Sequence, residues 1–133
     1  MPLQTLVDAE RLVGDWLRSH ADITAIVANR VATEVLARPC LKLGRIGGVP
    51  VVRQHLDAAR LQLDAYASNR GGARDLAVRA QAALHAMPAA SHALGVVTGV
   101  DDDLGLTWSP DPDLNDGPRF VFGVTVYLHP LPA

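Results

Sequence analysis

The chain has 133 residues, the size of one domain, and a chain of this length can bury a hydrophobic core without a disulfide or a metal. Its formal net charge is -2 and its twelve basic residues are scattered, so it lacks the concentrated basic sequence of a nucleic-acid-binding protein. The single cysteine excludes an internal disulfide, and no apolar stretch approaches the roughly 18 residues of a membrane helix.

The N-terminal segment predicts two helices. Over residues 3–20 apolar side chains recur at spacings of three and four, with acidic residues early and basic residues late, as an amphipathic helix requires. Asp22 can cap a short helical turn from Ile23 to Val27, and residues 30–36 then turn toward β character. The segment lacks the basic and apolar blocks of a secretion signal, and the single cysteine is typical of a protein made in the cytosol.

Two strand signals follow in the middle of the chain. Residues 41–46 alternate in polarity, as a strand does, and Gly47-Gly48 after them is a turn signal. Pro50 in the apolar segment 49–52 favours the edge of a sheet. Residues 41–52 are therefore expected to form a hairpin or an edge loop. The clearest strand is 59–67, where small and apolar residues alternate with polar ones. This alternation predicts a sheet with one face in the core and one polar face.

The second half predicts one helix and three strands. Alanine and leucine form an apolar stripe over residues 72–87, which Pro88 ends. Residues 94–100 and 104–108 read as two strands of a hairpin, with three aspartates at its tip. A polar, proline-rich loop at 109–118 leads to a last alternating strand at 119–128.

Most of these strands are joined by segments too short for the crossovers that parallel pairs need. We therefore expect an α+β fold, with an antiparallel or mixed β-sheet and two main helices packed on one of its faces. Neither an internal repeat nor a boundary between domains is visible, so residues 1–133 are expected to form a single domain.

The sequence carries no catalytic signature. It contains neither a phosphate-binding P-loop nor a G-x-S-x-G motif, and its five histidines form no H-x-x-x-H or H-x-H pair. The acidic triplet 101–103 could supply oxygen ligands to Ca²⁺ or Mg²⁺, but aspartates also favour solvated turns and partner-binding loops. We therefore expect no catalytic residue, no cofactor and no metal.

The predicted polar sheet face is the most informative surface. Mixed charge combined with tyrosine and arginine is typical of a protein interface, although a solvated sheet face has the same composition. With the acidic triplet added, the candidate subunit or partner contacts are Arg60, Gln62, Asp64, Tyr66, Asp101, Asp102 and Asp103.

The order of these segments resembles a known family. An N-terminal helix is followed by "ADITAIVANRVATEV", then by the strand, loop and helix "ARLQLDAYASNRGGARDLAVRAQAALHAM", a hairpin, and the final strand "RFVFGVTVYLHP". Over about residues 3–129 this pattern resembles the tail terminator, or tail completion, proteins of long-tailed bacteriophages with non-contractile tails. The resemblance lies in order and pattern, without a signature motif.

The resemblance implies a structural role in the virion. Such proteins form a ring, typically a hexamer, on the head-proximal end of the tail tube. The ring stops polymerisation of the major tail protein and presents a docking surface for the head–tail connector, while DNA passes through its lumen without sequence readout. The implied protein is no enzyme and binds no cofactor. The alternatives are a head–tail connector or neck protein, a monomeric binding module, and a small enzyme whose site is assembled from distant residues.

Overall fold

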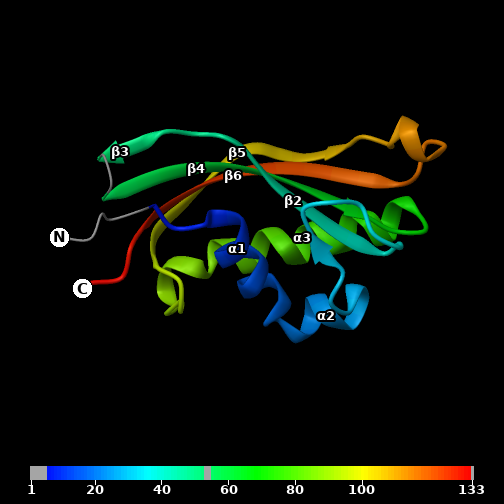
Figure 1. Ribbon diagram of the computed structural model, residues 1–133. Coiled ribbons are helices and arrows are strands. Elements are labelled where there is room, and N and C mark those ends of the chain that lie inside the picture. Colours follow the sequence, from blue (N-terminus) through cyan, green and yellow to red (C-terminus); the bar gives the residue numbers. More distant parts are fainter. Residues whose placement is uncertain (1–5, 53–54, 133) are drawn as a thin grey trace.

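A six-stranded sheet carries three helices on one of its faces in the structure, a computed structural model that describes residues 6–52 and 55–132. Figure 1 shows the sheet above and the helices α1, α2 and α3 below it. All strand pairs are antiparallel except the short pair β1–β2. The predicted α+β class, with a mixed sheet and helices on one face, is confirmed.

The helices begin and end at residues that differ from the predicted bounds. Helix α1 spans Ala9–Arg18, because Asp8 takes the extended N-cap conformation and its side chain accepts a hydrogen bond from the Arg11 amide at 3.1 Å. The predicted start at residue 3 lies outside the described residues. Helix α2 spans Ala21–Val27 with His20 at its N-cap, so the expected capping role of Asp22 was wrong. Asp22 instead lies in the first turn, where its charge suits the helix dipole.

Helix α3 spans Arg70–His85, two residues earlier than predicted at both ends. The Asn69 side chain accepts a hydrogen bond from the Gly72 amide at 2.7 Å and so fixes the start of the helix. The predicted apolar stripe is buried, and its last member, Met87, lies in the short 3-10 helix Met87–Ala89.

The strand order across the sheet is β1-β2-β4-β6-β5, with β3 beside β4 as well. The strands are β1 Val31–Ala32, β2 Cys40–Gly47, β3 Pro50–Val52, β4 Leu56–Tyr66, β5 Val96–Trp108 and β6 Arg119–His129. The strand character expected over residues 30–36 is confined to β1.

Residues 41–52 do not form a hairpin. Strands β2 and β3 both pair with β4, one after the other along the same side, and Gly47-Gly48 interrupts them. Gly48 has a φ of +89°, and a Cβ there would lie 1.9 Å from the Ala58 carbonyl oxygen. The glycine pair therefore makes an irregularity within one long edge, because the backbone of β4 approaches too closely for any other residue.

The predicted hairpin at 94–108 was wrong. Residues 96–108 form one strand, β5, which pairs with β6 from Val96↔His129 to Trp108↔Phe120. The acidic triplet lies in the middle of this strand, and the pairing register shifts at three places along it. Backbone pairing with β6 thus overrides the local turn preference of aspartate, and the side chains remain exposed because β5 is an edge strand.

The hydrophobic core lies between the sheet and the helices. The predicted alternation in 59–67 is confirmed, because Ala59, Leu61, Leu63, Ala65 and Ala67 are all buried on the helix side. Strand β6 contributes Phe120, Phe122, Val124, Val126 and Leu128 to the same cluster. None of the described helices is long and apolar enough to cross a membrane.

Candidate interaction surface

The sheet face opposite the helices carries most of the predicted contact residues. Arg60 on β4 is exposed, and Gln62 next along the same face is half-buried. Strand β6 places Thr125 beside Arg60, and β5 places Asp101 beside Thr125. Residues far apart in the sequence therefore meet on one polar face.

A small charged network occupies the centre of this face. The Asp103 carboxylate accepts a hydrogen bond from the Thr125 hydroxyl at 2.5 Å and lies 3.4 Å from Nε of Arg60. The neighbouring Asp101 carboxylate raises the pKa of Tyr127. Two of the three aspartates therefore join Arg60 on the helix-free face.

Asp102 points to the other side of the sheet. Its Oδ1 lies 2.8 Å from Nε2 of His85 and 3.5 Å from Nε2 of Gln81, both on α3. Successive strand residues point to opposite faces, so the triplet cannot act as a single cluster. The structure thus separates Asp102 from Asp101 and Asp103.

Asp64 and Tyr66 are buried within the chain rather than presented to solvent. Tyr66 is 1% exposed, and its hydroxyl donates to Asp111 Oδ2 at 2.8 Å. Burial, and next the hydrogen bond to Asp111, raise the pKa of Tyr66 to about 12, while the Tyr66 hydroxyl lowers the pKa of Asp111. Both side chains support the proline-rich loop 109–118, and a contact with a neighbouring chain stays a prediction for them.

Arg119 completes this anchor of the loop. Its Nε donates to the Ser109 carbonyl at 2.7 Å, and its guanidinium lies 3.6 Å from Asp64 and 3.8 Å from Asp111. The loop therefore lies over the Tyr66 end of the polar face, and Arg119, placed between the carboxylates of Asp64 and Asp111, holds it there.

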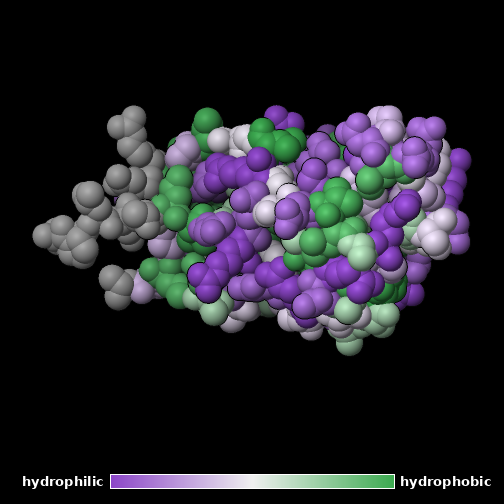
Figure 2. All heavy atoms as spheres, turned by 45° about the vertical axis from the view of Figure 1, so that its right-hand side comes forward, coloured by the Kyte–Doolittle hydropathy of each residue, from purple (hydrophilic) through white to green (hydrophobic). Residues whose placement is uncertain are grey.

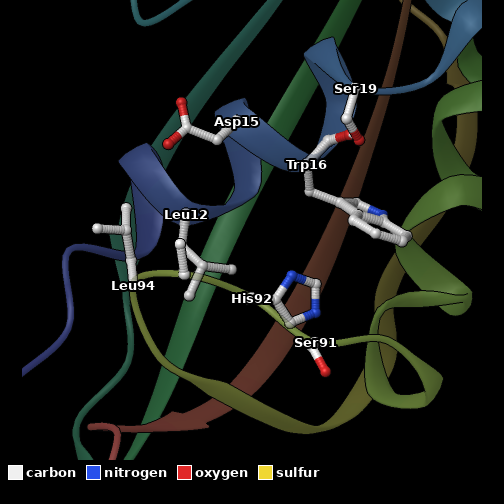
Figure 3. A pocket seen from close by; sticks show the side chains of 8 residues that line it. Leu12, Asp15, Trp16, Ser19, Ser91, His92 and Leu94 are labelled. Carbon is white, nitrogen blue, oxygen red and sulfur yellow. The ribbon is translucent and has the colours of Figure 1, made fainter.

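A cavity of about 240 Å³ lies between α1 and the segment before β5, as Figure 3 shows. The cavity is lined by aspartate, serine and histidine side chains, the residue types of a hydrolytic triad, but Asp15 accepts a hydrogen bond from the Arg18 guanidinium at 2.8 Å. Nε2 of His92 lies 2.9 Å from the Met87 carbonyl, and the Ser19 hydroxyl donates to the Trp16 carbonyl at 2.6 Å. Among the side chains that line this cavity, no serine hydroxyl is hydrogen-bonded to the His92 ring, so the cavity holds no nucleophile activated by a base.

Comparison with known proteins gives the family. Residues 11–106 match the family described as "Tail completion protein gp17". The chain belongs to this tail completion family. The matched range covers 96 of 133 residues and includes all seven candidate contact residues. The predicted resemblance is thereby confirmed, and the chain is a structural protein of a phage tail.

A solved structure has the same fold as this tail completion protein. It is a chain of the structure titled "Virion of native gene transfer agent (GTA) particle", with a TM-score of 0.69 and 17% sequence identity. The alignment covers 90% of this chain and 93% of that chain. No curated protein matches the chain by sequence.

None of the seven candidate contact residues lies in the exposed apolar segment of this tail completion protein. Ile46, Val49, Val51 and Val52 are 55%, 72%, 59% and 49% exposed and lie at the β2–β3 edge. In Figure 2 hydrophobic spheres gather at the end beside the grey residues, the end where Figure 1 places β3. The signal was present, because residues 49–52 are apolar without the alternation that a strand with one solvated face would show.

An ion pair fastens this segment to the sheet. Two guanidinium nitrogens of Arg45 donate to the two carboxylate oxygens of Asp57, at 2.6 and 2.9 Å, and its Nε donates to the Gly47 carbonyl at 3.0 Å. The Asp57 side chain is fully buried, and its hydrogen bonds raise the pKa of Arg45. The ion pair therefore fixes the direction in which the chain leaves β2 and enters β3.

Proposed function

We propose that this tail completion protein is the tail terminator, which forms a closed ring on the head-proximal end of the tail tube. The ring stops further addition of the major tail protein and offers the surface on which the head–tail connector docks. Its partners are then other copies of itself, the tube protein and the connector. DNA passes through the lumen without base-specific contact.

The surface of the described chain supports this proposal. A ring needs two different contact surfaces on each subunit, because its interfaces are head-to-tail. The chain offers a helix-free polar face, an acidic strand at one edge of the sheet and an apolar segment at the other. The apolar segment carries the argument, since exposed apolar clusters mark surfaces that are covered in an assembly.

A structural, non-enzymatic role also agrees with the polar groups of the described residues. Two of their buried interactions, Arg45–Asp57 and Tyr66–Asp111, hold backbone segments in place. A connector or neck protein is the alternative function. Such a protein would be expected to expose a helix or a tail for docking, and the described α-helices α1, α2 and α3 lie against the sheet or against one another (Figure 1).

Tube assembly in solution tests the proposal. Purified major tail protein polymerises into tubes, and substoichiometric terminator should stop their growth and appear as a ring at one tube end by electron microscopy. Light scattering across a concentration range should show whether the ring, a hexamer of 14.1 kDa chains, forms without tubes. Tubes that grow unchanged and carry no bound chain would contradict the terminator role.

A further inference from the structure

Both lateral edges of the sheet carry unpaired strand backbone. Within the described residues, β3 pairs only with β4, and β5 pairs only with β6 along its thirteen residues. The β3 edge consists of Pro50–Val52, whose residues are all exposed. An open strand edge is a template for pairing with another chain, and in β3, where Pro50 has no N–H, the backbone donors for such pairing are those of Val51 and Val52.

Strand directions in the sheet are compatible with continuation from one copy to the next. Strands β5, β6, β4 and the β2–β3 edge alternate in direction, since each neighbouring pair is antiparallel. If a second copy is placed beside the first in the same orientation, its β5 runs antiparallel to β3. Such a repeat generates a heterologous interface, the type that closes into a ring.

Charge distinguishes this arrangement from symmetric pairing. Asp101, Asp102 and Asp103 lie at the middle of β5, so an antiparallel β5–β5 contact would bring two acidic triplets together. The cations Arg30, Arg38 and Lys42 lie toward the β1 end of the opposite side, where Lys42 is level with Thr107 rather than with the triplet. These three cations form no ion pair with a carboxylate of the described residues.

Apolar contacts favour the same partner. In the sheet, Pro50 pairs with Asp57, Asp57 with Leu128, and Leu128 with Val97, so β3 lies level with the first residues of β5. Of those residues, Val96 and Val100 are half-buried, whereas Val97 belongs to the core of its own chain. In the second copy Val96 and Val100 would meet the exposed valines of β3 and cover them.

We propose that the β3 edge of one copy pairs with the β5 edge of the next copy, so that the sheet continues across the subunit interface. The occupant of the apolar β3 edge is thus a second copy of this chain. The inference rests on the proposed ring, and it specifies which surfaces form the ring contact.

Disulfide trapping between variants that each carry one added cysteine tests this interface. Val51→Cys, with Val49→Cys as a second β3 variant, is mixed in turn with Thr98→Cys, Leu104→Cys and Thr107→Cys, three exposed positions along β5. The native Cys40 is buried and should stay unreacted. The matched control replaces the exposed Val78 of α3 by cysteine.

We expect a covalent dimer with Thr98→Cys, which lies next to the level of β3, rather than with Leu104→Cys or Thr107→Cys. We expect none when Val51→Cys is oxidised alone or with the Val78→Cys control. A disulfide in every β3 variant alone would show a symmetric contact and overturn the inference. The absence of a covalent dimer in all β3–β5 mixtures would also overturn the inference. If light scattering shows a ring while these mixtures fail, the proposed function stands and only the assigned contact is removed.

Discussion

Removing the charge of Asp57 is the sharpest test of how the β2–β3 edge is held. The Asp57 side chain is fully buried and Arg45 is 29% exposed, so Asp57→Asn leaves a guanidinium that is largely desolvated and lacks its carboxylate. The substitution keeps the size of the side chain. Any loss of stability therefore reports the ion pair and its two hydrogen bonds rather than a cavity.

The expected loss follows from the burial of the pair. Breaking a fully buried ion pair costs about 3–5 kcal/mol, and the partial exposure of Arg45 lowers this to about 2–3 kcal/mol. In urea such a loss should lower the unfolding midpoint by roughly 1–2 M with an unchanged slope. The measurement is equilibrium unfolding followed by tryptophan fluorescence.

Asp75→Asn is the matched control. Asp75 and Arg79 form an exposed pair one helical turn apart, at 3.0 Å, and its loss should cost at most about 0.5 kcal/mol. The reasoning is refuted if Asp57→Asn unfolds at the same urea concentration as the wild type or the control. That result would show that Gly48 and the β4 backbone alone fix the edge.

Three further predictions follow from the same contacts. Gly48→Ala should lower the free energy of unfolding by at least about 1 kcal/mol, because Gly48 has φ +89° and a Cβ there would meet the Ala58 carbonyl oxygen. Gly105→Ala is the control, since Gly105 has open space around it and the substitution should not destabilise the fold. Equal unfolding midpoints for the two variants would contradict this prediction. Tyr66 has a pKa of about 12 in the folded chain and about 10 in the unfolded chain, so its contribution to the free energy of unfolding is complete below pH 10 and is lost as the pH rises through 12. Tyr66→Phe should therefore reduce the loss of stability between pH 10 and pH 12, measured by unfolding at a series of pH values. The same loss of stability in the variant and the wild type would refute this prediction. Val51→Asp should abolish ring formation, measured by light scattering, without destabilising the monomer, because Val51 is exposed on β3. Val78→Asp on α3 is the control and should leave the ring intact. A ring formed by both variants would show that the β3 edge is not part of the subunit contact.

The sequence predicted the parts of the fold in which local pattern and tertiary burial agree. Residues 59–67 and 119–128 place an apolar or small side chain at every second position, because one face of each strand packs on the helices. The other face also buries Asp64, Tyr66, Val121 and Thr125. The alanine-rich stripe of α3 was predictable for the same reason. In these segments the periodicity of apolar residues predicts the same secondary structure that burial against the helices requires.

The errors arose where a distant partner overrides a local preference. Three consecutive aspartates favour a turn, yet β6 supplies backbone partners on both sides of the triplet and keeps β5 continuous. Gly47-Gly48 resembles a hairpin turn, but β4 continues past it and pairs with both flanking strands. Neither partner can be identified from spacing alone.

The candidate surface was predicted in part. Alternation placed Arg60 and Gln62 on the helix-free face, and the structure adds Asp101 and Asp103 to it. The burial of Tyr66 could not be predicted, because its partner Asp111 lies 45 residues away in a loop without a periodic pattern. The apolar β3 edge, by contrast, was readable from the sequence.

Tail length in the absence of this chain tests the central claim most directly. Cells that produce the phage particles without this gene are lysed, and the lengths and head attachment of their tails are measured by electron microscopy. The terminator role predicts tails of uncontrolled length that carry no heads, restored by the wild-type gene supplied separately. Tails of normal length joined to heads would contradict the account, and tails of normal length without heads would assign the chain to the neck instead.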